Sequence, residues 1–193
     1  MRKKIALVTL LSLAASPAFA HVGHGSTASF AAGVAHPLGG LDHVSVMIAV
    51  GLWAALKGGR ALWAWPAAFV GVMLVGGALG MAQVPVPFVE PGILASVVAL
   101  GLLVALAVDL PVTVGAAIIG LFALFHGHAH GSEVAENIGG LEYMAGFAAA
   151  TTSLHAIGIA FARLMQHASL RPVVRVAGAA CVLLGVGLFA GVL

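Results

Sequence analysis

Nine histidines in a chain of 193 residues are the side chains best suited to chemistry. Three of them close an apolar stretch, in the run Phe-His-Gly-His-Ala-His-Gly at 125–131. His126 and His130 are four residues apart, so they share one face if the stretch is a helix. His128 then points elsewhere, and we expect it at the outer mouth of the site, beside Glu133. Because neutral imidazole is a common metal ligand, this run predicts metal binding.

Carboxylates inside apolar segments are the second signal. A carboxylate at the centre of a bilayer costs about 2.5–3.5 kcal/mol on insertion scales, so it needs a partner or a proton. Asp42 and Glu142 both lie in apolar segments, with no Lys or Arg nearby in the sequence. Two protonated acids would meet this requirement, and so would a bound cation. We favour the cation, because His36 and His43 flank Asp42.

Together these residues predict a transition-metal site built from separate helices. Imidazole with a few carboxylates suits Ni, Co, Zn or Cu(II), whereas Mg and Ca prefer all-oxygen sites. A thiolate site is excluded, because Cys181 is the single cysteine. The predicted metal ligands are His36, Asp42, His43, His126, His130 and Glu142, with His21 and His24 collecting metal at the entrance and His128, Glu133 and His155 on the transport pathway. For His155 alone, a helix-to-helix hydrogen bond is an equally good interpretation.

The elements that position these residues are predicted to cross a membrane. The chain is 62% hydrophobic and 7% charged, with a mean hydropathy of +1.14. Soluble domains carry roughly 25% charged residues, so lipid must surround most of this chain. Apolar stretches near the roughly 20 residues that cross a bilayer lie at about 27–57, 61–83, 89–109, 112–131, 139–166 and 172–193. We therefore predict an all-α polytopic membrane protein with about six transmembrane helices.

The first of these stretches is expected to be broken. The segment His-Pro-Leu-Gly-Gly at 36–40 interrupts it. Proline removes a backbone donor and the two glycines weaken a helix, so a break or kink should follow. Irregular backbone at membrane depth survives only where protein or water satisfies its polar groups, and such breaks often line a path.

The N-terminus has the pattern of a cleavable secretory signal peptide. A basic start, at Arg2, Lys3 and Lys4, precedes an apolar region at 5–15, and Ala-Phe-Ala at 18–20 supplies the small residues that signal peptidase accepts. Cleavage would leave His21 as the mature N-terminus, giving a signal peptide at 1–20 and a single transmembrane domain at 21–193. An uncleaved signal anchor is the alternative.

Loop charges predict how the chain crosses the membrane. The basic residues outside the signal are Lys57, Arg60, Arg163, Arg171 and Arg175, and they fall in or beside two of the predicted loops. If the N-terminus is periplasmic, all of them are cytoplasmic, as positive-inside topology requires. The expected location is a bacterial inner membrane, with the N- and C-termini in the periplasm. These charges are topology signals despite an isoelectric point near 9.1, so we expect the bilayer as a partner and no nucleic acid.

Several motifs also resemble one known family. They are His-Pro-Leu-Gly-Gly-Leu-Asp-His at 36–43 with Gly-Leu-Trp-Ala at 51–54, Phe-His-Gly-His-Ala-His-Gly-Ser-Glu at 125–133, Glu-Tyr-Met-Ala-Gly-Phe at 142–147 and Thr-Thr-Ser-Leu-His at 151–155. In these segments the chain resembles the HupE/UreJ family of nickel permeases. The resemblance implies uptake of Ni²⁺, or sometimes Co²⁺, into the cytoplasm for hydrogenase or urease, with hand-off to their maturation proteins.

We therefore predict a secondary transporter and not an enzyme. The sequence contains no Gly-x4-Gly-Lys-Ser/Thr nucleotide loop. The metal is the transported ligand, and no permanent cofactor is expected. Two other interpretations stay open, a membrane-embedded haem or di-metal protein and a non-transporting metal sensor or accessory subunit. Small residues on several spans would also permit a homo-oligomer.

Overall fold

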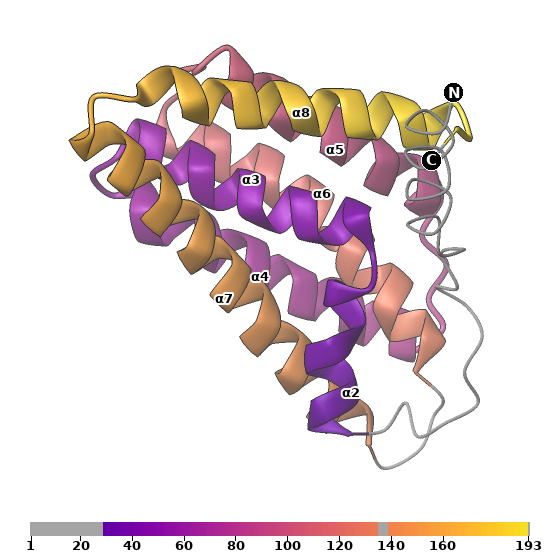
Figure 1. Cartoon of the computed structure of the whole chain (residues 1–193). Coiled ribbons are helices and arrows are strands. Elements are labelled where there is room, and N and C mark those ends of the chain that lie inside the picture. Colours follow the sequence, from indigo (N-terminus) through magenta and orange to yellow (C-terminus); the bar gives the residue numbers. More distant parts are fainter. Residues whose placement is uncertain (1–28, 135–138, 193) are drawn as a thin grey trace, which may run out of the picture.

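The fold is a bundle of helices, described by the computed structural model for residues 29–134 and 139–192 (Figure 1). The segments predicted as signal peptide and metal-collecting N-terminus, with His21 and His24, lie outside these residues. The helices are α2 (Phe30–Ala35), the 3-10 turn η1 (His36–Leu38), α3 (Leu41–Lys57), α4 (Ala61–Met81), α5 (Val89–Ala105), α6 (Val112–Glu133), α7 (Gly140–His167) and α8 (Arg171–Phe189). The described part of the chain contains no strand.

The lengths of these helices suit a bilayer. Helices α4, α6, α7 and α8 are long and apolar enough to cross, and α2 to η1 with α3 form a fifth, bent segment. Helix α5 is shorter, with 17 residues, or about 25 Å at 1.5 Å per residue. That is at the lower end of what spans a hydrocarbon core. The prediction of an all-α polytopic membrane protein is confirmed.

The first segment is broken where its sequence predicted. Helix α2 ends before Pro37, which lies in η1, and α3 starts again after Gly40. The axes on either side of this break differ by 87° (Figure 1). Gly40 has an extended backbone, with φ −107° and ψ 121°, so it starts α3 in a new direction. His36 and Asp42 are close in the sequence, but the break puts them on elements that point in different directions.

Two helix ends differ from the prediction. Helix α5 stops at Ala105 and not near 109, because Ala107 has a positive φ of 51° and Pro111 follows two residues after Asp109. The residue before a proline is pushed out of helical conformation, so the chain cannot continue as helix there. Helix α6 runs to Glu133 instead of ending near 131. This extension puts Glu133 on the same helix as His130.

Helices α4 and α6 pack with their backbones in contact. A Cβ atom on Gly76 would collide with the carbonyl of Leu124, and one on Gly127 would collide with the carbonyl of Met73. Small residues of this kind are what allow close packing of helices in membranes. The close packing fixes the rotation of α6, and with it the direction in which His126 points.

Successive long helices run in alternating directions, so the bundle has two ends (Figure 1). We call the end with His36, His130 and Glu133 the histidine end. We call the opposite end, where Trp53 stacks on Trp65, the tryptophan end. The large buried side chains between them, among them Phe69, Met73 and Ile119, form the core of the bundle.

Candidate metal centre

Four imidazole rings form a continuous row near the histidine end. The ring centroids of His36 and His130 are 4.6 Å apart, those of His130 and His43 are 4.5 Å apart, and those of His43 and His126 are 4.8 Å apart. We call these residues the histidine row. They come from η1, α3 and α6, so the structure brings together four of the predicted ligands from segments far apart in the sequence.

Within this row, Asp42 orients the ring of His43. The Nδ1 atom of His43 lies 2.8 Å from Oδ1 of Asp42, and the backbone N–H of His43 donates to the same oxygen. A carboxylate can only accept, so neutral His43 must donate from Nδ1. Its Nε2 then carries a lone pair, and this buried atom has no hydrogen-bond partner among the described residues. In metal-binding histidines, one ring nitrogen commonly binds the metal while the N–H of the other donates to a carboxylate.

A serine orients His126 in the same way. The hydroxyl of Ser96 donates its proton to the carbonyl of Ile93, so its oxygen must accept from Nε2–H of His126, 3.0 Å away. The lone pair of His126 is therefore on Nδ1, which is buried and lacks a partner in the described structure. His126 is fully buried, so this atom does not face bulk water. Such unpaired buried acceptors are rare in proteins, and a cation is a partner that a lone pair of this kind can accept.

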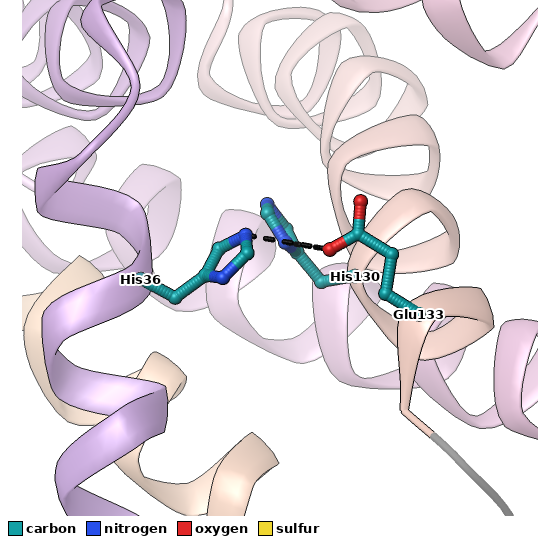
Figure 2. A group of neighbouring side chains, drawn as sticks. All are labelled: His36, His130 and Glu133. Atoms are coloured by element: carbon teal, nitrogen blue, oxygen red, sulfur yellow. Dashed lines mark ion pairs between the residues drawn. The ribbon is translucent and has the colours of Figure 1, made fainter. Parts of the chain in front are cut away.

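The outer part of the row includes a carboxylate. Nε2 of His36 lies 3.4 Å from Oε2 of Glu133, and Nδ1 of His130 lies 4.0 Å from the same oxygen. Figure 2 shows His36 pointing from one element toward His130 and Glu133 on another. One ligand atom from each of the three residues lies within 4.8 Å of the others, close enough to share a metal ion. His36 and Glu133 are about one-third exposed, with side-chain exposures of 31% and 37%, so this part of the row is open to the outside.

The remaining predicted residues lie apart from the row. Glu142 is exposed in the first turn of α7, and the described structure gives it no ring contact or ion pair with a histidine. Its role as a ligand stays a prediction, and Glu133 occupies the position that was expected for it. Nε2 of His128 lies 2.8 Å from the carbonyl oxygen of Val84, in the loop before α5.

His155 lies deeper in the bundle, beyond a phenyl ring. Its Nδ1 lies 2.8 Å from the backbone carbonyl oxygen of Met47 on α3. The helix-to-helix hydrogen bond that the sequence offered as an alternative role for His155 is therefore present, and it uses one of the two ring nitrogens. The ring of Phe69 contacts both His126 and His155. The sequence reasoning missed both Phe69 and Ser96, because a phenylalanine or a serine in an apolar span gives no signal of its own.

The arrangement suits capture of a divalent transition metal from one end of the bundle. Several imidazoles and one carboxylate favour Ni²⁺, Co²⁺, Zn²⁺ or Cu²⁺ over Mg²⁺ or Ca²⁺. In two of the imidazoles, those of His43 and His126, one ring nitrogen donates to a nearby acceptor and the other has a lone pair without a hydrogen-bond partner in the described structure. Within the described residues, Asp42 contacts His43 and forms no ion pair with a lysine or arginine.

Comparison with known proteins agrees with these features. The family model described as HupE / UreJ protein matches residues 8–188. The protein HupE of Rhizobium leguminosarum bv. viciae is 45% identical over 186 residues, which cover 96% of this chain and 97% of the relative. No solved structure matches the chain.

Proposed function

The chain belongs to the HupE/UreJ family, and from that premise we propose that it is a secondary permease for divalent transition-metal ions, Ni²⁺ before Co²⁺. The family is associated with nickel and cobalt transport, so metal uptake is the activity expected at this level. The observation that supports it best is the histidine row, in which buried imidazole nitrogens inside a membrane bundle have bare lone pairs.

In this proposal the ion enters at the histidine end. His36 and Glu133 bind it first, because they are exposed, together with the buried His130 beside them. It then passes inward to His43 and His126, whose lone pairs are already oriented. A transport site must also release its ion, so each stage should bind with moderate affinity and not as a closed cage.

The same proposal places the histidine end in the periplasm of a bacterial inner membrane. Lys57, Arg171 and Arg175 lie together around a cavity at the tryptophan end, and positive charge favours the cytoplasmic side. With cleavage after Ala20, His21 and His24 would collect metal at the periplasmic entrance. Hand-off to hydrogenase or urease maturation proteins and self-association belong to this proposal as well.

A haem protein fits the row less well. The rings of neighbouring histidines are in direct edge-to-face contact, with centroids 4.5–4.8 Å apart, which leaves no slot for a porphyrin. A sensor or accessory subunit would bind metal without moving it, and transport measurements separate that function from a permease.

The test is radiometal influx into proteoliposomes of the purified chain, comparing Ni²⁺, Co²⁺ and Zn²⁺. We expect saturable Ni²⁺ influx in the natural protein and none in Asp42→Asn, because the neutral amide no longer balances a cation beside His43. The variant should stay folded, since Asn keeps the side-chain oxygen that accepts from His43. Folded natural protein that binds Ni²⁺ but carries no ion would instead support the sensor.

A further inference from the structure

His155 uses only one of its two nitrogens for structure. Nδ1 lies 2.8 Å from the carbonyl oxygen of Met47 and must donate to it, since a carbonyl has no proton to give. Neutral His155 therefore has its lone pair on Nε2. This atom is buried and has no hydrogen-bond partner in residues 29–134 and 139–192. His155 is 1% exposed, so bulk water does not reach the ring.

This arrangement repeats that of the histidine row. His43 and His126 are each held by an acceptor on one nitrogen and leave the other bare. The hydrogen bond to Met47 uses the donor of the ring, so that bond does not explain why an acceptor is left buried on the other nitrogen. The unpaired Nε2 is therefore available to a ligand.

Phe69 contacts both His155 and the row. Its ring centroid is 5.8 Å from that of His126 and 5.1 Å from that of His155, and the side chain is fully buried. A phenyl ring has no lone pair for an ion. A metal that passes from His126 to His155 along these ring contacts therefore meets the phenyl ring.

We propose that His155 is an inner metal-binding station and that Phe69 is the gate between it and the histidine row. The ion leaves Nδ1 of His126, the phenyl ring turns, and Nε2 of His155 becomes its next ligand. This inference rests on the proposed permease function and adds a second station and a barrier to it. The class of ligand is the same divalent transition metal, bound here more weakly than at the row because fewer protein donors surround it.

His155→Asn tests the inner station. The asparagine amide can still donate to Met47 from near the position of Nδ1, while the atom that would bind metal is gone. We expect maximal ⁶³Ni²⁺ influx into proteoliposomes to fall at least tenfold, while Ni²⁺ binding to the detergent-solubilised variant stays within twofold of the natural protein. Influx within twofold of the natural rate would overturn the station, and loss of both binding and influx would show a structural role and overturn it too.

Phe69→Leu tests the gate without touching the hydrogen bond of His155, so it also keeps the proposal testable if the asparagine variant does not fold. We expect Ni²⁺ influx at least threefold faster and a weaker preference for Ni²⁺ over Zn²⁺. Leu100→Val, another fully buried core position, on α5, is the matched control for lost packing and should leave both unchanged. A rate at or below that of the natural protein in Phe69→Leu would overturn the gate.

These outcomes differ from a failure of the permease proposal itself. If the natural protein carries no Ni²⁺, transport is wrong and the station has nothing to receive. If the natural protein carries Ni²⁺ and both variants behave like it, transport stands and the inner station and gate are wrong.

Discussion

The two ends of the bundle treat their buried polar atoms in opposite ways. At the histidine end, ring nitrogens of His43, His126 and His130 have no hydrogen-bond partner in the described structure. At the tryptophan end, the buried indoles of Trp53 and Trp65 both donate to backbone carbonyls, at Val108 and Val112. The histidine end therefore has ring nitrogens that are free to bind a ligand, whereas both indole N–H groups at the tryptophan end already have hydrogen-bond partners.

This difference indicates which end offers ligand atoms to a metal. The ring centroids of Trp53 and Trp65 lie 4.1 Å apart, and an indole has no lone pair on nitrogen to offer a metal. Beyond them is a cavity of about 370 Å³ lined by Lys57, Asp109 and two arginines. The candidate metal site therefore lies at the histidine end, whereas basic residues and the Lys57–Asp109 ion pair lie at the tryptophan end.

The largest expected effect is a difference in Ni²⁺ affinity between variants of two carboxylates, Glu133 and Glu142. Glu133→Gln should lower Ni²⁺ affinity by at least the roughly 100-fold that loss of an orienting partner can cost, because it removes a direct ligand shared with His36 and His130. Glu142→Gln, on the exposed start of α7, should change affinity less than twofold. Isothermal titration of both purified variants with Ni²⁺ measures this. The reverse order would show that Glu142 and not Glu133 completes the site.

A smaller loss is expected when the ring of His126 is released. Ser96→Ala removes the acceptor that holds Nε2–H of His126, and loss of such an orienting partner costs roughly 10–100-fold in metal affinity. Ser153→Ala is the matched control, since that hydroxyl donates to the carbonyl of Ala149 on an exposed face. Equilibrium Ni²⁺ binding compares the two. Equal affinities would mean that the hydrogen bond of Ser96 does not prepare His126 for metal.

Acidification should reduce uptake by about tenfold for each imidazole that has to lose a proton before it binds. Histidine in water has a pKa near 6.5 and binds metal only when neutral, so influx should be full above that pH and fall as the pH is lowered through it to about 5.5. The initial rate of Ni²⁺ influx against external pH measures this. His128→Gln should keep the same profile, because the ring of His128 lies beside Val84 and not in the row. A flat profile between pH 7.5 and 5.5 would argue against imidazole ligands at the entrance.

The smallest effect is expected at the tryptophan end. Lys57 and Asp109 form an ion pair in which the acid is 77% exposed, and exposed pairs contribute about 0–1 kcal/mol to stability. Lys57→Gln should therefore shift the thermal unfolding midpoint by no more than a few degrees and leave Ni²⁺ binding unchanged. Light scattering during a thermal ramp, together with a binding titration, tests both. A large loss of Ni²⁺ affinity would mean that the two ends are coupled even without transport.

The sequence predicted the helices and most of the histidine row because residue type and spacing carry that information. His126 and His130 follow from a separation of four residues, and His36 and His43 from the broken segment between them. The two carboxylates show where this reasoning stops, because the spacing alone did not indicate that Glu133 lies beside His36 and His130 while Glu142 lies exposed on α7. The rotation of a helix and the residue at which it ends depend on packing against its neighbours, so Glu142 stays a prediction. The i, i+3 spacing of His130 and Glu133 was the available signal.

Phe69 and Ser96 could not have been selected from sequence for a related reason. Each is an ordinary residue for an apolar span, and each matters only because of the ring that lies next to it. Those neighbours depend on how closely the helices approach. The glycine contacts between helices therefore determine which side chains lie next to His126 and His155, and the spacing of residues along one helix does not.

The glycine contacts also have a mechanical consequence. Gly76 and Gly127 lock α4 to α6, while Gly51 and Gly158 bring α3 and α7 into similar backbone contact. These four helices thus form two interlocked pairs, with Phe69 and His126 on one and His43 and His155 on the other. A small rocking of one pair against the other would change the His43–His126 and Phe69–His155 separations in a single movement. Release of the ion from the row and opening of the way inward would then be parts of one displacement.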